Sequence, residues 1–105
     1  MKLWVDDVRP APDGYVRCKS VKEAKNAIIE SEQFSVWYDT SFYITLIDID
    51  HDAGDYANDG GDYIKLLDWL EETGRNYPIR IHSQNPVGVE NMRRIIQRNN
   101  WKEVF

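Results

Sequence analysis

The segment Phe42-Tyr43-Ile44-Thr45-Leu46-Ile47-Asp48-Ile49-Asp50-His51-Asp52 decides the fold. Its first half is rich in aromatic and β-branched residues, which predicts a strand over residues 43–50. Three aspartates and a histidine then occupy residues 48–52 together with one isoleucine. Desolvating carboxylates at the end of a buried strand is unfavourable. A metal, a phosphate-handling site or a positive partner offsets this desolvation free energy. The segment therefore predicts the floor of an active or ligand-binding site.

Outward from this segment, strand patterns alternate with helix patterns. The capping box Ser20–Glu23 predicts a helix that runs to about Ser31. Gly74 is a suitable C-cap for a second helix, and Pro86 suits the first turn of a third. Residues 34–42 fit either an extra strand or an aromatic insertion. We expect strands at residues 2–5, 15–18, 43–50, 78–81 and 101–105, and helices that begin near residues 21, 63 and 86.

This alternation predicts an α/β fold, an open parallel five-stranded sheet with helices on both faces. At 105 residues we expect one domain, residues 1–105. Ligands of open sheets bind beyond the carboxyl ends of the strands, where the strand order reverses. Polar clusters follow three predicted strands, and we expect them to meet at one edge: Asp6-Asp7, Asp50-His51-Asp52 and His82-Ser83.

Composition narrows the class of protein. The chain has 13 Lys and Arg against 18 Asp and Glu, a formal net charge of −5. This charge argues against a surface built for non-specific nucleic-acid binding, although it leaves room for a local basic patch. Cys18 is the only cysteine, so an intrachain disulfide is excluded and a reducing compartment is favoured. With no apparent signal sequence or membrane span, we expect a cytoplasmic protein.

Four motifs lie at these predicted strand ends: Asp6-Asp7-Val8-Arg9-Pro10, Pro12-Asp13-Gly14, Asp50-His51-Asp52-x-Gly54 and the run His82–Met92. Together they resemble the cyclic-phosphate processing receiver-like family over nearly the whole chain. The resemblance implies a flavodoxin-like or receiver-like sheet whose first helix is reduced to the loop Val8–Gly14 or lost. It also implies processing of cyclic phosphates, such as the 2′,3′-cyclic phosphates at RNA ends. The expected substrate is an RNA end or a cyclic nucleotide, and other RNA-repair enzymes are expected partners.

The chemistry of such a reaction suggests roles for the strand-end residues. Hard cations such as Mg²⁺ or Mn²⁺ bind carboxylate oxygens and water. Opening a cyclic phosphodiester needs an activated water, a proton for the leaving ribose oxygen and stabilisation of the developing charge. Asp48 shares a strand face with Asp50 and is either a further ligand or a buried aspartate bonded to backbone amides. We predict metal ligands at Asp6, Asp7, Asp50 and Asp52, and catalytic residues at Asp50, His51 and His82.

The phosphate group needs donors of its own. We predict that Arg9 binds it bidentately, with Ser83, Asn85 and Arg93 as further contacts. Asn85 has a second interpretation, because it precedes Pro86 and suits a helix N-cap. The acidic loop of residues 55–62 is either a lid over the site or a solvated loop.

These residues favour an enzyme, a metal-dependent phosphoesterase, but two alternatives stay open. Asp50 matches the phosphoacceptor of receiver domains, so the chain could be an atypical receiver that is phosphorylated there. Phosphorelay receivers carry a Lys at the end of the fifth strand, whereas this chain ends Glu103-Val104-Phe105, which argues against that role. The third possibility is a non-catalytic module that binds a nucleotide or phosphate.

Overall fold

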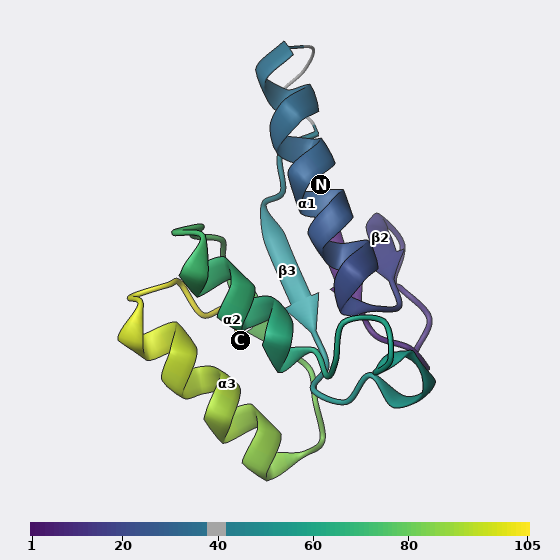
Figure 1. The fold of residues 1–105 in the computed structure, drawn as a ribbon, viewed down its shortest axis with the longest axis vertical. Helices are drawn as coiled ribbons and strands as arrows, with labels where there is room; N and C mark the ends of the chain where they lie inside the picture. The colour runs from purple at the N-terminus through teal and green to yellow at the C-terminus, as the bar shows by residue number, and fades with distance from the viewer. Residues whose placement is uncertain (38–41) are drawn as a thin grey trace.

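The computed structural model describes residues 1–37 and 42–105. Four strands and three α-helices alternate after an initial strand pair (Figure 1). No helix in these two ranges is long and apolar enough to cross a membrane. The elements are β1 (Lys2–Val5), β2 (Tyr15–Cys18), α1 (Val21–Trp37), β3 (Leu46–Ile49), α2 (Ile64–Glu72), β4 (Ile79–Ile81) and α3 (Pro86–Arg98).

The strands form one parallel sheet in the order β2-β1-β3-β4. Strand order therefore reverses between β1 and β3, which lie side by side at the centre of the sheet. The sheet has four strands where five were predicted. Residues 101–105 contribute only a single parallel bridge, between Ile79 and Glu103. Residues 6–14, between β1 and β2, form a loop.

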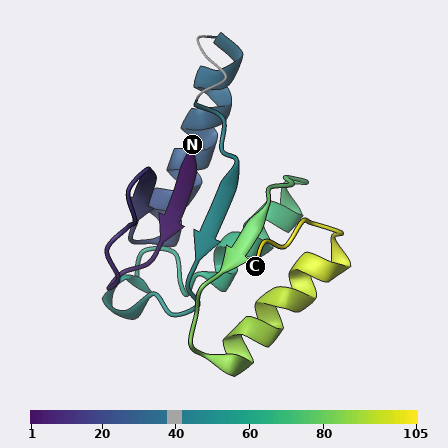
Figure 2. The ribbon, with the colours of Figure 1, turned by 180° about the vertical axis from the view of Figure 1, so that it is seen from behind.

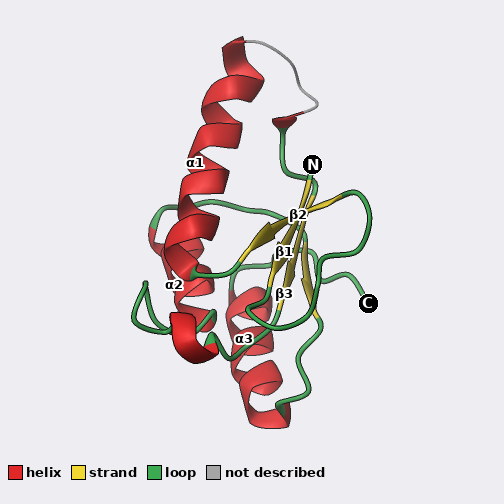
Figure 3. Ribbon diagram, turned by 90° about the vertical axis from the view of Figure 1, so that its right-hand side faces the viewer, coloured by secondary structure: helices red, strands yellow, loops and turns green. Residues whose placement is uncertain are grey.

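All three helices lie on the same side of the sheet, so the prediction of helices on both faces is wrong (Figures 2 and 3). The connections β2-α1-β3 and β3-α2-β4 both cross the sheet in the same direction, and right-handed crossovers in one direction place their helices on one face. The connection from β1 to β2 runs in the opposite direction and would place a helix on the other face. Because this connection is a loop, no described helix covers that face, which we call the open face.

The hydrophobic core lies between the helices and the inner face of the sheet. Alternate strand residues such as Leu3, Val5 and Ile47 point into it, and α2 and α3 bury their apolar faces there. Ser20 caps α1 as predicted, since its Oγ accepts the Glu23 N–H at 3.1 Å, while the Glu23 carboxylate accepts the N–H of Lys19, one residue before the cap, at 2.8 Å. The second and third helices begin close to the predicted positions.

Helix α1 is longer than predicted and continues through residues 34–37, while residues 38–41 of the ambiguous segment lie outside the described ranges. Strand β3 is shorter than predicted and begins at Leu46. Helix α1 is held to the segment before β4 by Glu32, which accepts bidentate bonds from Arg75 at 2.9 and 3.0 Å and a bond from Tyr77 at 2.7 Å.

Candidate functional site

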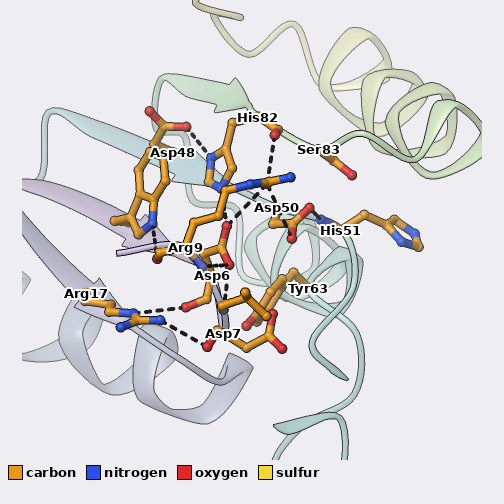
Figure 4. Close-up of polar contacts among 12 residues, drawn as sticks. Asp6, Asp7, Arg9, Arg17, Asp48, Asp50, His51, Tyr63, His82 and Ser83 are labelled. Atoms are coloured by element: carbon orange, nitrogen blue, oxygen red, sulfur yellow. Dashed lines mark hydrogen bonds and ion pairs between the residues drawn. The ribbon is translucent and has the colours of Figure 1, made fainter. Parts of the chain in front are cut away.

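Three aspartates meet at the carboxyl edge of the two central strands. Asp6 and Asp7 follow β1, and Asp50 follows β3, where its N–H donates to the Val5 carbonyl at 2.9 Å. One carboxylate oxygen from each lies within 4.8 Å of the others. We call Asp6, Asp7 and Asp50 the acidic triad (Figure 4). It lies where the strand order reverses, the position at which open parallel sheets bind ligands.

Arg9 extends its guanidinium toward this triad. Its Nη1 lies 3.5 Å from Asp6 Oδ2 and 3.9 Å from Asp50 Oδ2, and it donates to the His82 carbonyl at 3.2 Å. The side chain is 39% exposed, so its remaining N–H groups are accessible to a ligand. Arg9 therefore combines partial neutralisation of the triad with the capacity to bind an anion.

Asp6 is the buried member of the triad. Burial alone would raise its pKa, but Oδ1 accepts the backbone N–H groups of Arg9 at 3.0 Å and Val8 at 2.8 Å. Together with the contact to His82, these bonds hold the pKa of Asp6 below its usual value of 3.8. Asp6 is consequently ionised at neutral pH, as a ligand for a cation must be.

His82 bridges two fully buried carboxylates. Its Nδ1 lies 2.6 Å from Asp48 Oδ1, and its Nε2 lies 2.8 Å from Asp6 Oδ2. The ring also stacks on Trp4, with the centroids 3.9 Å apart and the planes 3° from parallel. A neutral imidazole carries one N–H, so both contacts are hydrogen bonds only if the bridge holds one additional proton.

This geometry changes the role expected for His82. Both ring nitrogens are occupied by carboxylates, and the side chain is only 7% exposed, so neither nitrogen faces a space that a substrate could enter. Sequence reasoning placed His82 at the correct edge of the sheet but predicted a catalytic role that the ring orientation does not favour. His82 instead positions the carboxylate of Asp6.

Asp48 lies on the open face of β3 and is fully buried. Besides His82, it accepts a bond from Arg80 Nη1 at 3.0 Å, and the Tyr15 hydroxyl lies 3.5 Å away. The sequence allowed Asp48 to be a further metal ligand or a buried aspartate bonded to backbone amides. Neither interpretation describes Asp48, because it is not part of the triad and its partners are side chains. It anchors His82 from the side opposite Asp6.

His51 and Asp52 lie outside the triad. The His51 ring points away from the three aspartates (Figure 4), and its Nδ1 contacts Asp52 Oδ1 at 2.7 Å. The ring packs against Gly88 of α3, where an added Cβ would overlap it. Asp52 is 62% exposed, and the structure does not bring its carboxylate to the triad, so the prediction that it is a metal ligand is not supported.

The predicted phosphate contacts separate into two groups. Ser83 Oγ accepts the Asn85 N–H at 3.1 Å, and Asn85 Oδ1 caps α3 by accepting the Gly88 N–H at 3.0 Å. Both residues remain at the carboxyl edge of the sheet. Arg93 does not, because Glu103 holds its guanidinium with three contacts of 2.7–3.0 Å. The prediction that Arg93 binds phosphate is therefore not supported.

Two residues that sequence reasoning did not assign to the site support the triad. Arg17 of β2 donates to the carbonyls of Asp6 and Asp7 at 3.4 and 3.0 Å. Tyr63 lies beside the triad with its hydroxyl bonded to the Lys19 carbonyl at 2.6 Å; burial and the nearby aspartates raise its pKa. Neither residue shows a sequence signal, because both reach the site only through the sheet order and the packing of α2.

The acidic loop is fixed on both sides. Ser20 donates to Asp59 at 2.7 Å, and Asp62 accepts the Ala53 N–H at 3.1 Å. Gly54, with φ +55°, passes so close to Asp7 that an added Cβ would overlap its carboxylate. The loop is therefore a wall of the site held against α1, rather than a lid attached at its ends alone.

The comparison with known families is consistent with this geometry. A family model for the cyclic-phosphate processing receiver domain matches residues 1–98. The chain belongs to this family. No curated protein and no solved structure gave a significant match. The parallel sheet and three helices of this family member fit a receiver-like domain, and family membership fits a role with cyclic phosphates.

A divalent cation is compatible with the residues present in the triad. All three donors are carboxylate oxygens, which Mg²⁺ and Mn²⁺ prefer. Asp6, Asp7 and Asp50 are therefore the residues that would hold such an ion.

Proposed function

We propose that this receiver-like domain opens 2′,3′-cyclic phosphates at RNA ends with the help of a divalent cation held by the acidic triad. The observation that carries the proposal is the convergence of three carboxylates within 4.8 Å, with an arginine beside them, in a member of a cyclic-phosphate processing family. The expected ions are Mg²⁺ and Mn²⁺.

The reaction adds water to phosphorus and breaks one of the two ribose phosphoester bonds. The ribose oxygen takes up a proton, and the product is a phosphomonoester. A cation bound by the triad would polarise a phosphoryl oxygen and make bound water more acidic. The three carboxylates of the triad would also fix the position of the cation.

Each remaining residue has a distinct proposed part. The Arg9 guanidinium binds the phosphate and balances the charge that develops on it. Asp50 is the partly exposed triad member whose Oδ2 lies toward Arg9, and it is the proposed base for the attacking water. Ser83 contributes its hydroxyl to the phosphate. His82 keeps Asp6 in place and does not exchange protons with the substrate.

A turnover assay tests the proposal. Purified protein is incubated with 2′,3′-cyclic AMP and Mg²⁺ or Mn²⁺, and the monoester is followed by ³¹P NMR. Asp50→Asn should abolish ring opening, whereas Asp52→Asn, which removes an exposed carboxylate outside the triad, should leave it unchanged. Absence of ring opening with either ion, on this nucleotide and on cyclic-phosphate-ended RNA, would reject the enzyme.

Phosphorylation of Asp50 in signalling is the second candidate, because the residue is partly exposed beside two further aspartates, as at a receiver phosphorylation site. Mass spectrometry after treatment with acetyl phosphate and Mg²⁺ tests it, and an unmodified chain rejects it. A binding module without catalysis would show a raised melting temperature with cyclic nucleotide but no product.

A further inference from the structure

The open face of the sheet leads directly to the acidic triad. Side chains alternate along each strand, so Trp4 and Asp48 point to this face together with the triad members two residues further on, Asp6 and Asp50. No described helix covers it (Figure 2). The triad and the open face therefore form one continuous surface.

The exposed charges on the strand residues of this face are all positive. Among strand residues on this side, the charged side chains that reach solvent are Lys2, Arg17 and Arg80, while Asp48 is fully buried beneath them. Arg80 remains 42% exposed despite its bond to Asp48. The open face is therefore locally basic, although the chain as a whole has a net charge of −5.

The surface has the dimensions of a short polyanion path. Trp4 is in register with Arg17 on one side and Asp48 on the other, and Asp48 is in register with Arg80. Three strand spacings of about 4.8 Å therefore put the backbones of Arg17 and Arg80 about 14 Å apart. Lys2 lies four residues before Asp6, about 13 Å away along β1. Its ammonium lies 5.4 Å from the ring centroid of Tyr15, a partly exposed aromatic residue on the same face.

We infer that the open face binds the single-stranded RNA that precedes a terminal cyclic phosphate, with Lys2, Arg17 and Arg80 contacting its phosphodiesters. The inference rests on the proposed function, since it assumes that the terminal phosphate lies at the triad. The cations of the open face indicate a negatively charged partner, because a polyanion extending from the triad would meet these cations along β1 and across to β4. The substrate class is then an oligonucleotide end, and a free cyclic mononucleotide uses only part of the surface.

Binding measurements test this without requiring turnover. Fluorescence anisotropy would compare a 5′-labelled RNA tetramer carrying a 3′-phosphate, which the proposed reaction does not consume, with 3′-AMP as competitor, in Mg²⁺, between 50 and 200 mM salt. Three phosphate contacts predict a logarithmic slope of about −2, or roughly twentyfold weaker tetramer binding over this range. Lys2→Gln/Arg80→Gln leaves about one contact, so the loss should fall to roughly threefold.

Controls separate charge on this face from charge in general. Lys22→Gln removes an exposed cation from α1 on the helix side and should keep the wild-type salt slope. Arg80→Lys keeps the charge and should retain most of the tetramer affinity and its salt dependence. Thermal melting of each variant confirms that it is folded, and Arg17 is left intact because it supports Asp6 and Asp7.

The outcomes distinguish this inference from the proposed function. Equal affinity for tetramer and mononucleotide, or equal salt slopes for the double variant and Lys22→Gln, would overturn the RNA path even if cyclic AMP is opened. Absence of ring opening with intact, salt-dependent tetramer binding would instead reject the enzyme and retain the RNA surface.

Discussion

Replacing His82 by alanine is the most informative perturbation of this structure. The change removes the group between two fully buried carboxylates, Asp6 and Asp48, and leaves both with fewer partners. Leaving a buried charged acceptor without its hydrogen-bond partner costs about 1–3 kcal/mol or more for each carboxylate. The lost stack on Trp4 adds about 0.5–1.5 kcal/mol.

The hydrogen bonds that Asp6 and Asp48 keep in the variant determine how large the loss of stability is. Asp48 keeps its bond to Arg80, and Asp6 keeps two backbone N–H donors, so each carboxylate stays partly satisfied. We therefore expect His82→Ala to lower the free energy of unfolding by about 4 kcal/mol, a large share of the 5–15 kcal/mol typical of a domain. Asp52→Ala is the control, because it removes a His–carboxylate contact whose carboxylate is 62% exposed, and it should cost about 1 kcal/mol or less.

Urea denaturation measures these differences, provided that the m-value stays constant. A double-mutant cycle with Asp48→Asn should show a coupling of about 2 kcal/mol, because removing either partner already breaks the bridge. A loss for His82→Ala no greater than that for Asp52→Ala, or simple additivity with Asp48→Asn, would refute the bridge. A stable His82→Ala protein that keeps the wild-type Mn²⁺ affinity but loses ring opening would restore the catalytic role.

Three further perturbations test the site and the fold. Asp50→Asn should raise the Kd for Mn²⁺ at least about tenfold, about 1.4 kcal/mol, by titration calorimetry, whereas Asp52→Asn should not change it. Gly54→Ala should weaken Mn²⁺ binding, because its methyl group displaces a triad carboxylate; Gly14→Ala, at φ +85° in open space, should cost stability but leave the Mn²⁺ affinity unchanged. Burial would raise the pKa of Glu32, but its bonds to Arg75 and Tyr77 lower this pKa below 4.5. The stabilisation from these bonds is therefore present above pH 4.5 and is lost as the pH falls through the lowered pKa. Denaturation of Glu32→Gln should accordingly show a smaller loss of stability below pH 4.5 than the wild type, and an equal loss would contradict the pairing.

The elements of the fold could be predicted from sequence because each rests on a local signal. The Ser20–Glu23 capping box, the Gly74 turn and Pro86 all act within a few residues, and the structure shows helix boundaries near each. The fifth strand and the placement of the helices could not be predicted in this way. They depend on the order in which strands join the sheet, and no local pattern encodes that order.

The candidate site shows the same distinction between features set by local sequence and features set by tertiary contacts. Strand-end position predicted which residues gather, and the acidic triad is the result. Side-chain direction was not predictable, because it depends on partners distant in sequence: His82 turns toward Asp48, 34 residues away, whereas His51 pairs with its neighbour Asp52. Arg17 and Tyr63 contribute through tertiary contacts alone, so composition and periodicity gave no reason to select them.

The loop between β1 and β2 connects the fold to the chemistry. A helix between β1 and β2 would cover the open face and bury its central residues with apolar side chains. Here Trp4, Asp48 and His82 are buried instead by stacking and by bonds to one another and to Arg80. An ionic arrangement of this kind is weak as a source of stability but fixes side-chain direction, and it ends on a ligand of the proposed metal site. The loop between β1 and β2 therefore leaves the triad open along the sheet, and His82 holds Asp6 there.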